Sequence, residues 1–164
     1  MSSIKSLMIS STVVTNFPRI DIIFIMHDMV RDFTNWAPFM SRKEREGLDL
    51  SCSGVYMLGY FPKNKPRKPV VSNSIIYIGE TCGQKLCGRL EQFERSAKNG
   101  TGGHSGGITF SKKYGRSELS FLYLSVLGVS LGEVKSPAYI RYVERALLWQ
   151  YVQKNNRLPA CNKK

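Results

Sequence analysis

The chain has 164 residues, 42% of them hydrophobic and 22% charged, a composition typical of one soluble globular domain. Its formal net charge is +12. Residues 1–53 carry six basic and six acidic side chains, so the whole excess lies in residues 54–164. A compact unit with this excess attracts polyanions, and nucleic acid is the leading partner. A membrane-surface binder is the alternative for a basic protein of this kind.

Targeting and membrane-spanning segments are not evident in the sequence. Met1–Ser11 has one lysine and no sustained apolar core, and the apolar run Ile22–Met26 is far shorter than the roughly 20 residues that span a bilayer. We therefore expect a cytoplasmic protein without disulfides. A zinc site can be drawn from three cysteines and one histidine, Cys82, Cys87, His104 and Cys161. Their spacing is not a paired CxxC pattern, so we favour buried or idle thiols.

The first fifty residues predict a helical extension. Asp21–Phe33 has apolar residues at helical spacing. Ser41–Leu48 is a second short helix, with Ser41 as N-cap and Glu44 at the third helical position. Because this region is electrically neutral, we expect residues 1–50 to pack on the main unit without forming the main nucleic-acid surface.

The main unit, residues 51–164, begins with two predicted strands. Gly54–Phe61 and Ser74–Gly79 are rich in β-branched and aromatic residues, which is typical of strands. Between them lies a proline-containing stretch that cannot feed a sheet ladder and is predicted to be a loop. It carries four positive charges, Lys63, Lys65, Arg67 and Lys68. Two strands joined by a loop indicate an antiparallel hairpin.

The rest of the main unit alternates helix and strand. A helix runs from Leu86 to about Asn99, and the five glycines of residues 99–107 predict a loop. Ser117–Leu127 is the third predicted strand. A last helix is expected from Ser136, as N-cap before a proline, to about Lys154. The order strand, strand, helix, strand, helix indicates a mixed α/β (α+β) fold in which helices cover a small sheet.

Four side chains are candidates for a functional site. Glu144 does not fit the apolar pattern of its helix, and the other three are informative only when they are considered together. Glu144 lies among apolar neighbours of the last helix, where an isolated charge is costly to bury. It is therefore a metal ligand, or it pairs with Arg141 or lies at the edge of the apolar stripe. Arg89 is either a phosphate contact or a solvated arginine. Tyr56 and Tyr77, taken singly, are ordinary core tyrosines.

In their chain order these residues resemble the GIY-YIG nuclease family. The two name-giving elements are Gly54-Val55-Tyr56 and Tyr77-Ile78-Gly79, each on a predicted strand. Arg89 follows on the next helix and Glu144 lies on a late helix, as the family's arginine and metal-ligand glutamate do. The ending Leu158–Asn162 is similar to the family's closing segment, which supplies a site asparagine. The resemblance covers roughly residues 52–163.

The resemblance implies a three-stranded antiparallel sheet flanked by helices, and hydrolysis of phosphodiester bonds in DNA with one Mg²⁺ (or Mn²⁺). Glu144 would bind the metal and Arg89 would hold the scissile phosphate. Tyr56 would act as general base on the attacking water or orient it, and with an ordinary pKa near 10 it would need help from basic surroundings. Tyr77 would position a water or a phosphate oxygen. Asn162 would hold the phosphate or fix the tyrosines.

The chain departs from the family pattern in three places, of which Val55 in place of isoleucine is harmless in a strand. Lys63–Ser74 is an insertion between the two tyrosines. Phe93 lies one turn after the arginine, at a position where many members carry His or Tyr. Phenylalanine cannot transfer a proton, so this role is empty or is filled by another residue. His104 is the obvious replacement, and an exposed loop histidine is the alternative. The site asparagine is expected at position 162 from its Leu-Pro-x-Cys-Asn context, with Asn155 and Asn156 as alternatives.

The chain shows no separate DNA-binding module, which suits a compact restriction-type or phage-type endonuclease. Specificity would come from the insertion, the glycine-rich segment and the N-terminal helices. Expected DNA contacts are the basic residues Lys63, Lys65, Arg67, Lys68, Lys112 and Lys113. Double-stranded DNA is the expected substrate, and a homodimer or transient pair would allow both strands to be cut. The alternative is a non-catalytic nucleic-acid-binding or partner-binding module built on the same fold.

Overall fold

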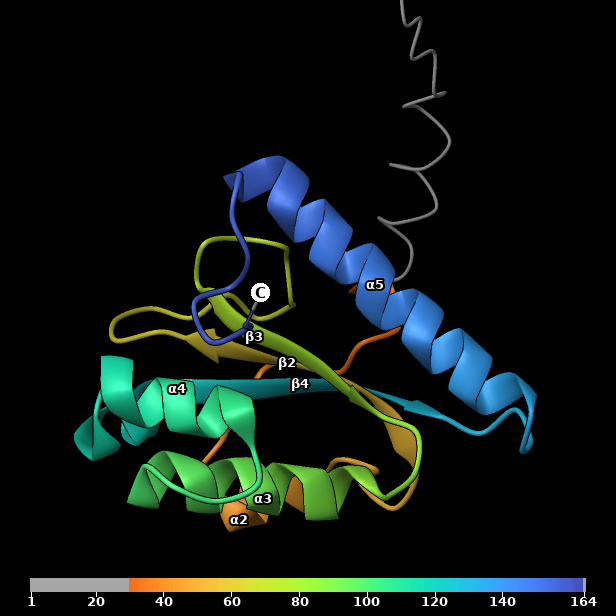
Figure 1. Ribbon diagram of the computed structural model, residues 1–164, viewed down its shortest axis with the longest axis horizontal. Helices are drawn as coiled ribbons and strands as arrows, with labels where there is room; N and C mark the ends of the chain where they lie inside the picture. The colour runs from red at the N-terminus through yellow and green to blue at the C-terminus, as the bar shows by residue number, and fades with distance from the viewer. Residues whose placement is uncertain (1–29, 164) are drawn as a thin grey trace, which may run out of the picture.

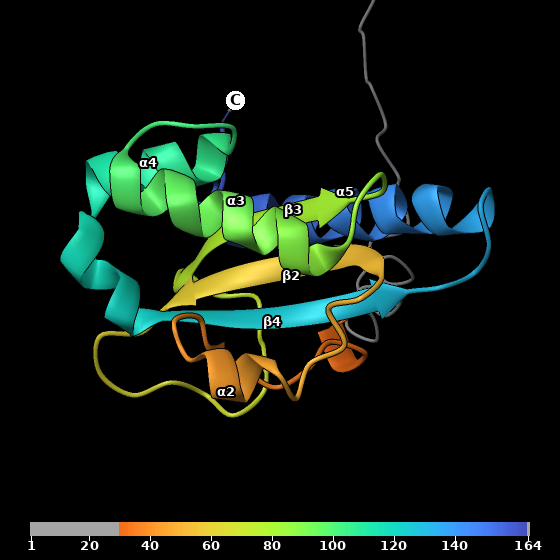
Figure 2. The ribbon, with the colours of Figure 1, turned by 90° about the horizontal axis from the view of Figure 1, so that it is seen from below.

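A four-stranded antiparallel sheet lies between helices in the computed structural model, which describes residues 30–163 (Figures 1 and 2). The elements in chain order are β1 (Ala37–Pro38), α2 (Arg42–Arg45), β2 (Ser53–Tyr60), β3 (Ile75–Thr81), α3 (Leu86–Asn99), α4 (Ser105–Lys113), the 3₁₀ helix η1 (Arg116–Phe121), β4 (Leu122–Val129) and α5 (Lys135–Asn155). Most of the helix expected over Asp21–Phe33 lies outside the described residues. None of the described helices has the length and apolar character needed to cross a membrane.

The sheet has the order β1-β4-β2-β3, so the expected count of three strands is wrong. The extra strand is β1, in which Ala37 pairs with Leu124 of β4. Its second residue is Pro38, which has no N–H and is tolerated because β1 lies at the edge of the sheet. A two-residue strand that contains a proline carries no alternating pattern, which is why the sequence does not reveal it.

Helices cover both faces of the sheet, with α5 on one face and α3 and α4 on the other (Figure 1). The central strand β2 divides its side chains between the two layers, because successive residues of a strand point to opposite faces. Val55 and Met57 belong to the core under α5, and Tyr56 and Leu58 belong to the core under α3 and α4. All four are fully buried. The tyrosine of the first motif therefore faces α3 and α4.

Three local predictions are confirmed. Strands β2 and β3 form the expected antiparallel hairpin, with Met57 opposite Ile78. Helix α3 ends at Gly100, whose φ of 71° is the left-handed conformation that glycine adopts readily. The short helix α2 follows Ser41, whose Oγ accepts a hydrogen bond from the backbone N–H of Glu44 at 3.3 Å.

The glycine-rich segment is a loop over residues 100–104 only, and not over the whole of residues 99–107 as expected. Helix α4 begins at Ser105 and includes Gly106 and Gly107 in its first turn. A Cβ on Gly107 would lie 2.5 Å from the carbonyl oxygen of Phe93 in α3. These glycines therefore allow two helices to approach closely, a role that local propensity does not distinguish from loop flexibility.

Two other boundaries differ from the expectation. The first half of the strand expected over Ser117–Leu127 is the 3₁₀ helix η1, which Gly115 introduces with a φ of 88°. Ser136 is not the N-cap of the last helix, because α5 begins one residue earlier at Lys135. The Oγ of Ser136 accepts a hydrogen bond from the backbone N–H of Leu131 at 2.8 Å, so it stabilises the preceding turn.

Candidate active site

Four of the expected site residues converge on the α3 and α4 face of the sheet. Tyr56 lies on the central strand β2 and Tyr77 on the edge strand β3, with their ring centroids 5.7 Å apart. Arg89 of α3 interacts electrostatically with both hydroxyl groups and with His104, which precedes α4. The two strands and two helices thus bring an arginine, two phenols and an imidazole together.

A hydrogen bond in this cluster joins His104 to Tyr56. The Nε2 atom of His104 lies 2.8 Å from the hydroxyl oxygen of Tyr56. Both residues are fully buried, so an exposed loop histidine is the wrong interpretation. The imidazole packs edge-on against Phe93 at 5.0 Å between ring centroids. A histidine from another element therefore lies beside the position where Phe93 interrupts the family pattern.

The hydrogen-bond partners of His104 determine its tautomer. Its Nδ1 accepts a hydrogen bond from the backbone N–H of Gly107 at 3.2 Å, as the N-cap of α4. A backbone N–H can only donate, so in the neutral ring the proton is on Nε2, which donates to the oxygen of Tyr56. Burial and the nearby charge of Arg89 lower the pKa of His104 to about 4. The imidazole is therefore neutral at pH 7.

Two glycines hold the ring of Tyr77 between them. A Cβ on Gly79 would lie 2.4 Å from Cε1 of Tyr77, and a Cβ on Gly106 would lie 2.4 Å from Cε2 of the same ring. The Gly79 position would also meet the hydroxyl of Tyr56 at 3.0 Å. Gly106 was not among the expected site residues. The signal for it was a glycine pair next to His104, which local propensity interprets as a loop.

Burial opposes ionisation of both tyrosines. It is the main cause that raises the pKa of Tyr56 well above 10 and also raises the pKa of Tyr77. Arg89 lowers the pKa of Tyr56, in the direction expected of basic surroundings, but burial outweighs its effect. Both phenols are therefore protonated at neutral pH in the protein alone.

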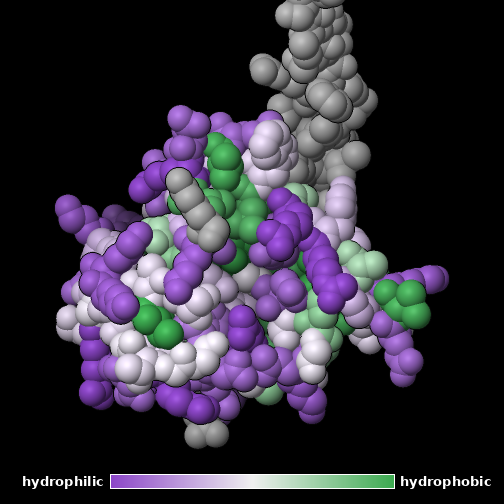
Figure 3. Space-filling view, viewed as in Figure 1, coloured by the Kyte–Doolittle hydropathy of each residue, from purple (hydrophilic) through white to green (hydrophobic). Residues whose placement is uncertain are grey.

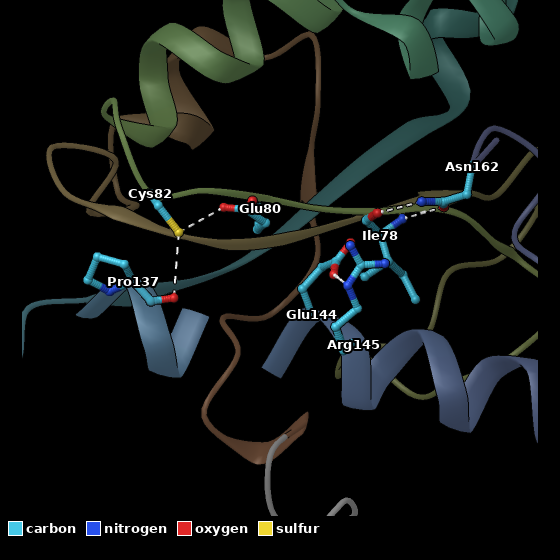
Figure 4. A network of polar contacts seen from close by, with 7 residues as sticks. All are labelled: Ile78, Glu80, Cys82, Pro137, Glu144, Arg145 and Asn162. Atoms are coloured by element: carbon cyan, nitrogen blue, oxygen red, sulfur yellow. Dashed lines mark hydrogen bonds and ion pairs between the residues drawn. The ribbon is translucent and has the colours of Figure 1, made fainter. Parts of the chain in front are cut away.

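Glu144 extends from α5 toward strand β3, near Ile78 (Figure 4). Its side chain is 12% exposed and pairs with Nε of Arg145 at 3.2 Å, so Arg141 is not its partner. Burial raises the pKa of Glu144, Arg145 lowers it, and the neighbouring Glu80 raises it. Glu144 also raises the pKa of Tyr77 electrostatically, which indicates that the carboxylate lies near this part of the site.

Glu80 is a second carboxylate near Glu144 that was not among the expected site residues. It lies on β3, next to the Tyr-Ile-Gly motif, and accepts a hydrogen bond from Sγ of Cys82 at 3.1 Å (Figure 4). Burial and Glu80 raise the pKa of the Cys82 thiol to about 11, so the thiol is protonated at neutral pH. Within residues 30–163, no three His, Cys, Asp or Glu side chains form a group that could hold a metal ion.

Asn162 binds the edge of β3. Its Oδ1 accepts from the backbone N–H of Ile78 at 3.0 Å, and its Nδ2 donates to the Ile78 carbonyl oxygen at 2.7 Å (Figure 4). This pair of bonds holds the strand between Tyr77 and Gly79. The other two asparagines are at the end of α5: Asn155 donates to the Tyr151 carbonyl, and Asn156 is the left-handed C-cap.

The six expected DNA-contacting residues are all exposed on the surface. Lys63, Arg67 and Lys68 are exposed in the segment between β2 and β3, and Lys112 is exposed at the end of α4. Lys65 donates to the Trp36 carbonyl at 3.5 Å, and Lys113 donates to the Ala160 carbonyl at 2.6 Å. Among residues 30–163, no hydrogen bond or ion pair joins these six side chains to Tyr56 or Tyr77.

Comparisons of the chain with protein-family models, with curated proteins and with solved structures found no match.

Proposed function

We propose that this chain is a divalent-metal-dependent endonuclease that hydrolyses phosphodiester bonds in DNA with a site of the GIY-YIG type. The observation that carries the proposal is the convergence of Tyr56, Tyr77, Arg89 and His104 from four separate elements, with Glu144 close to Tyr77. A cluster of buried polar groups costs stability unless the groups pair or serve a function. The resemblance to the nuclease family suggests the reaction, and the basic charge suggests that the substrate is nucleic acid.

The carboxylates fit a hard divalent cation. Glu144 is largely buried, lies near a second carboxylate, Glu80, and pairs with Arg145, whose side chain is 80% exposed. A cation would relieve the repulsion between the two carboxylates. One carboxylate suffices for Mg²⁺, which keeps several waters and takes phosphate oxygens as further ligands. When bound, Mg²⁺ would stabilise negative charge on the scissile phosphate and on the leaving oxygen.

Arg89 is the residue that would hold the phosphate. Its Nη1 donates to Oε1 of Gln92 at 3.2 Å, and Gln92 in turn bonds to Gln84 at 3.0 Å. The guanidinium has five N–H groups, so beyond this bond and its interactions with Tyr56 and Tyr77 it would still have donors for phosphate oxygens. Its charge lies close to Tyr56, so the same residue would also stabilise the phenolate form of that tyrosine.

Tyr56 would take the proton from the attacking water. With cation and DNA bound, the phenol of Tyr56 would first lose its own proton to solvent. The phenolate would then take a proton from the attacking water, the water oxygen would bond to phosphorus, and the bond from phosphorus to the leaving oxygen would break, with solvent supplying a proton to that oxygen. The Nε2–H of His104 donates to the phenol oxygen and would stabilise the phenolate, as Arg89 would. His104 thus acts as a donor to the base rather than as the proton carrier.

Double-stranded DNA is the proposed substrate, and two copies of the chain would cut its two strands. The +12 charge favours binding to a polyanion whose phosphates release counterions. A single carboxylate-based site would cut one strand at a time, so two copies acting together explain a double-strand break most simply.

Incubation of supercoiled plasmid with the protein and Mg²⁺ tests this function. We expect nicking or linearisation that falls at least about 100-fold in Glu144→Gln and in Tyr56→Phe. Glu91→Gln, on the exposed side of α3, and Tyr139→Phe, on α5, are matched controls that should cleave normally. Salt-sensitive DNA binding without cleavage, unchanged in Glu144→Gln, would support the non-catalytic binding module instead.

A further inference from the structure

The outward face of α5 carries a stripe of aromatic and arginine side chains that the proposed chemistry does not use. Tyr142, Arg145 and Trp149 follow one another at i, i+3 and i+7, which places them on one side of the helix. Tyr142 and Trp149 are each 52% exposed, and the Arg145 side chain is 80% exposed. Both aromatic residues lie outside the two hydrophobic cores of the described chain.

The charges on α5 select the kind of partner. Glu144 is the only acidic residue of this helix, and its side chain is largely buried, with 12% of its surface exposed. The exposed residues flanking the stripe add Arg141 and no acid. A second copy would oppose arginines to like-charged arginines across a two-fold axis, which is unfavourable. The face is complementary to a polyanion.

Aromatic rings separated by an arginine suit unpaired nucleotides. Tyr142 and Trp149 are about 10 Å apart along the helix axis, with Arg145 between them. Bases of a single strand stack on exposed aromatic rings regardless of sequence, and arginine binds the intervening phosphate. In a continuous duplex the bases are stacked on one another and present only their edges in the grooves.

The stripe is also coupled to the candidate active site. Arg145 pairs with Glu144 at 3.2 Å, so one residue of the stripe contacts the carboxylate that would bind the metal. On the face shown in Figure 3, hydrophobic patches are separated by hydrophilic side chains. One patch is at the projecting turn between β4 and α5, where Leu131 and Val134 are exposed.

We propose that the α5 stripe binds an unpaired segment of nucleic acid next to the scissile phosphate, with Trp149 and Tyr142 stacking on bases and Arg145 holding a phosphate. The preferred substrate is then DNA with a single-stranded portion, such as a flap or a splayed end, beside a duplex. The position of this segment beside a cleaved bond rests on the proposed nuclease function, but the binding itself is measured without cleavage.

Tryptophan fluorescence in EDTA tests the binding on the full chain. The chain has two tryptophans, and Trp36 is only 4% exposed, so Trp149 is the accessible reporter. A single-stranded 16-mer should quench the emission and bind more tightly than a blunt duplex of the same sequence. Because both Trp149 variants lack this reporter, their binding and that of the wild type are compared by the anisotropy of the same 16-mer carrying a fluorescein label. In this assay Trp149→Ala should weaken binding of the single strand about 5- to 100-fold, and Trp149→Phe should retain it within about threefold.

A control variant and competing ligands show whether the ring of Trp149 itself binds the single strand. Phe121→Ala removes an exposed aromatic ring outside α5 and should bind the single strand normally. Equal binding of the single strand by Trp149→Ala and wild type would overturn the inference. Three other results would also overturn it. Vesicles of anionic lipid could quench the emission more strongly than the single strand does, which would indicate a membrane surface. A wild-type dimer could dissociate in Trp149→Ala, or the melting temperature of that variant could fall greatly, which would indicate a dimer interface or a structural role. If plasmid cleavage fails while this binding persists, the nuclease proposal falls and the binding surface stands.

Discussion

The hydroxyl oxygen of Tyr56 lies 2.8 Å from Nε2 of His104, although the two residues are 48 positions apart in the chain. Because Nδ1 of the same imidazole accepts from the backbone of Gly107, the ring donates to the phenol and caps α4 at once. One side chain thus has a structural and a proposed chemical role. The two can be separated experimentally.

His104→Asn should separate the cap from the chemistry. Asparagine is a good N-cap, so it can still accept the N–H of Gly107, but its shorter side chain cannot reach Tyr56. We expect the melting temperature to fall by a few degrees and plasmid cleavage to fall about 10- to 100-fold. Ser120→Ala, which removes an exposed hydroxyl of η1, is the control. Wild-type cleavage by His104→Asn would remove His104 from the mechanism.

The stability of the protein should depend on His104 at acidic pH. Burial lowers the pKa of this histidine from 6.5 to about 4, so the folded state favours the neutral ring. The contribution of the neutral His104 ring to the free energy of unfolding is fully present above pH 6.5. It is lost as the pH falls from 6.5 through 4. Melting curves from pH 7 to 4.5 should therefore fall less in His104→Asn than in wild type. Parallel curves would contradict this assignment.

Gly106→Ala should displace Tyr77. The added Cβ would lie 2.4 Å from the tyrosine ring, which is wedged against Gly79 on its other side and has nowhere to move without strain. We expect a loss of about 1–3 kcal/mol in the free energy of unfolding and at least tenfold slower cleavage. Gly103→Ala is a matched control, because its Cβ would meet nothing within 4 Å. Equal melting temperatures for the two variants would show that the helix accommodates the methyl group.

Asn162→Ala should loosen the edge of β3. The substitution removes both bonds to the backbone of Ile78, each worth about 1 kcal/mol. We expect faster hydrogen exchange in the peptide covering Ile75–Thr81 and slower cleavage, because Tyr77 is on this strand. Asn99→Ala, at the exposed end of α3, is the control. Slower cleavage with unchanged exchange would instead give Asn162 a direct contact with the phosphate.

Glu144→Gln should stabilise the protein when no divalent cation is present. Burial raises the pKa of Glu144 in the folded state, so its stabilising contribution is present below about pH 4.5 and is lost as the pH rises through the raised value. At pH 8 in EDTA the neutral glutamine avoids this cost, and the variant should melt a few degrees above wild type. Adding Mg²⁺ should then raise the melting temperature of wild type but not of Glu144→Gln. The same Mg²⁺ effect in both proteins would place the cation elsewhere.

The sequence by itself determined the elements whose signals are local. The β2 and β3 hairpin, the helix ending at Gly100 and the cap at Ser41 all follow from residues within a few positions of one another. The alternation along β2 and the charge of residues 54–164 are likewise readable without coordinates. Such patterns report backbone preference and the side that faces the core.

The tertiary structure decided what lies against what. Gly106 and Gly107 were interpreted as loop because local propensity cannot record that Tyr77 and Phe93 press on them from other elements. Glu80 was missed because its proximity to Glu144, on another element, is not visible in the local sequence. The short strand β1 was missed because it exists only through its pairing with β4. The contact between His104 and Tyr56 depends on how the start of α4 packs against strand β2, across 48 positions of the chain, which no short-range pattern encodes.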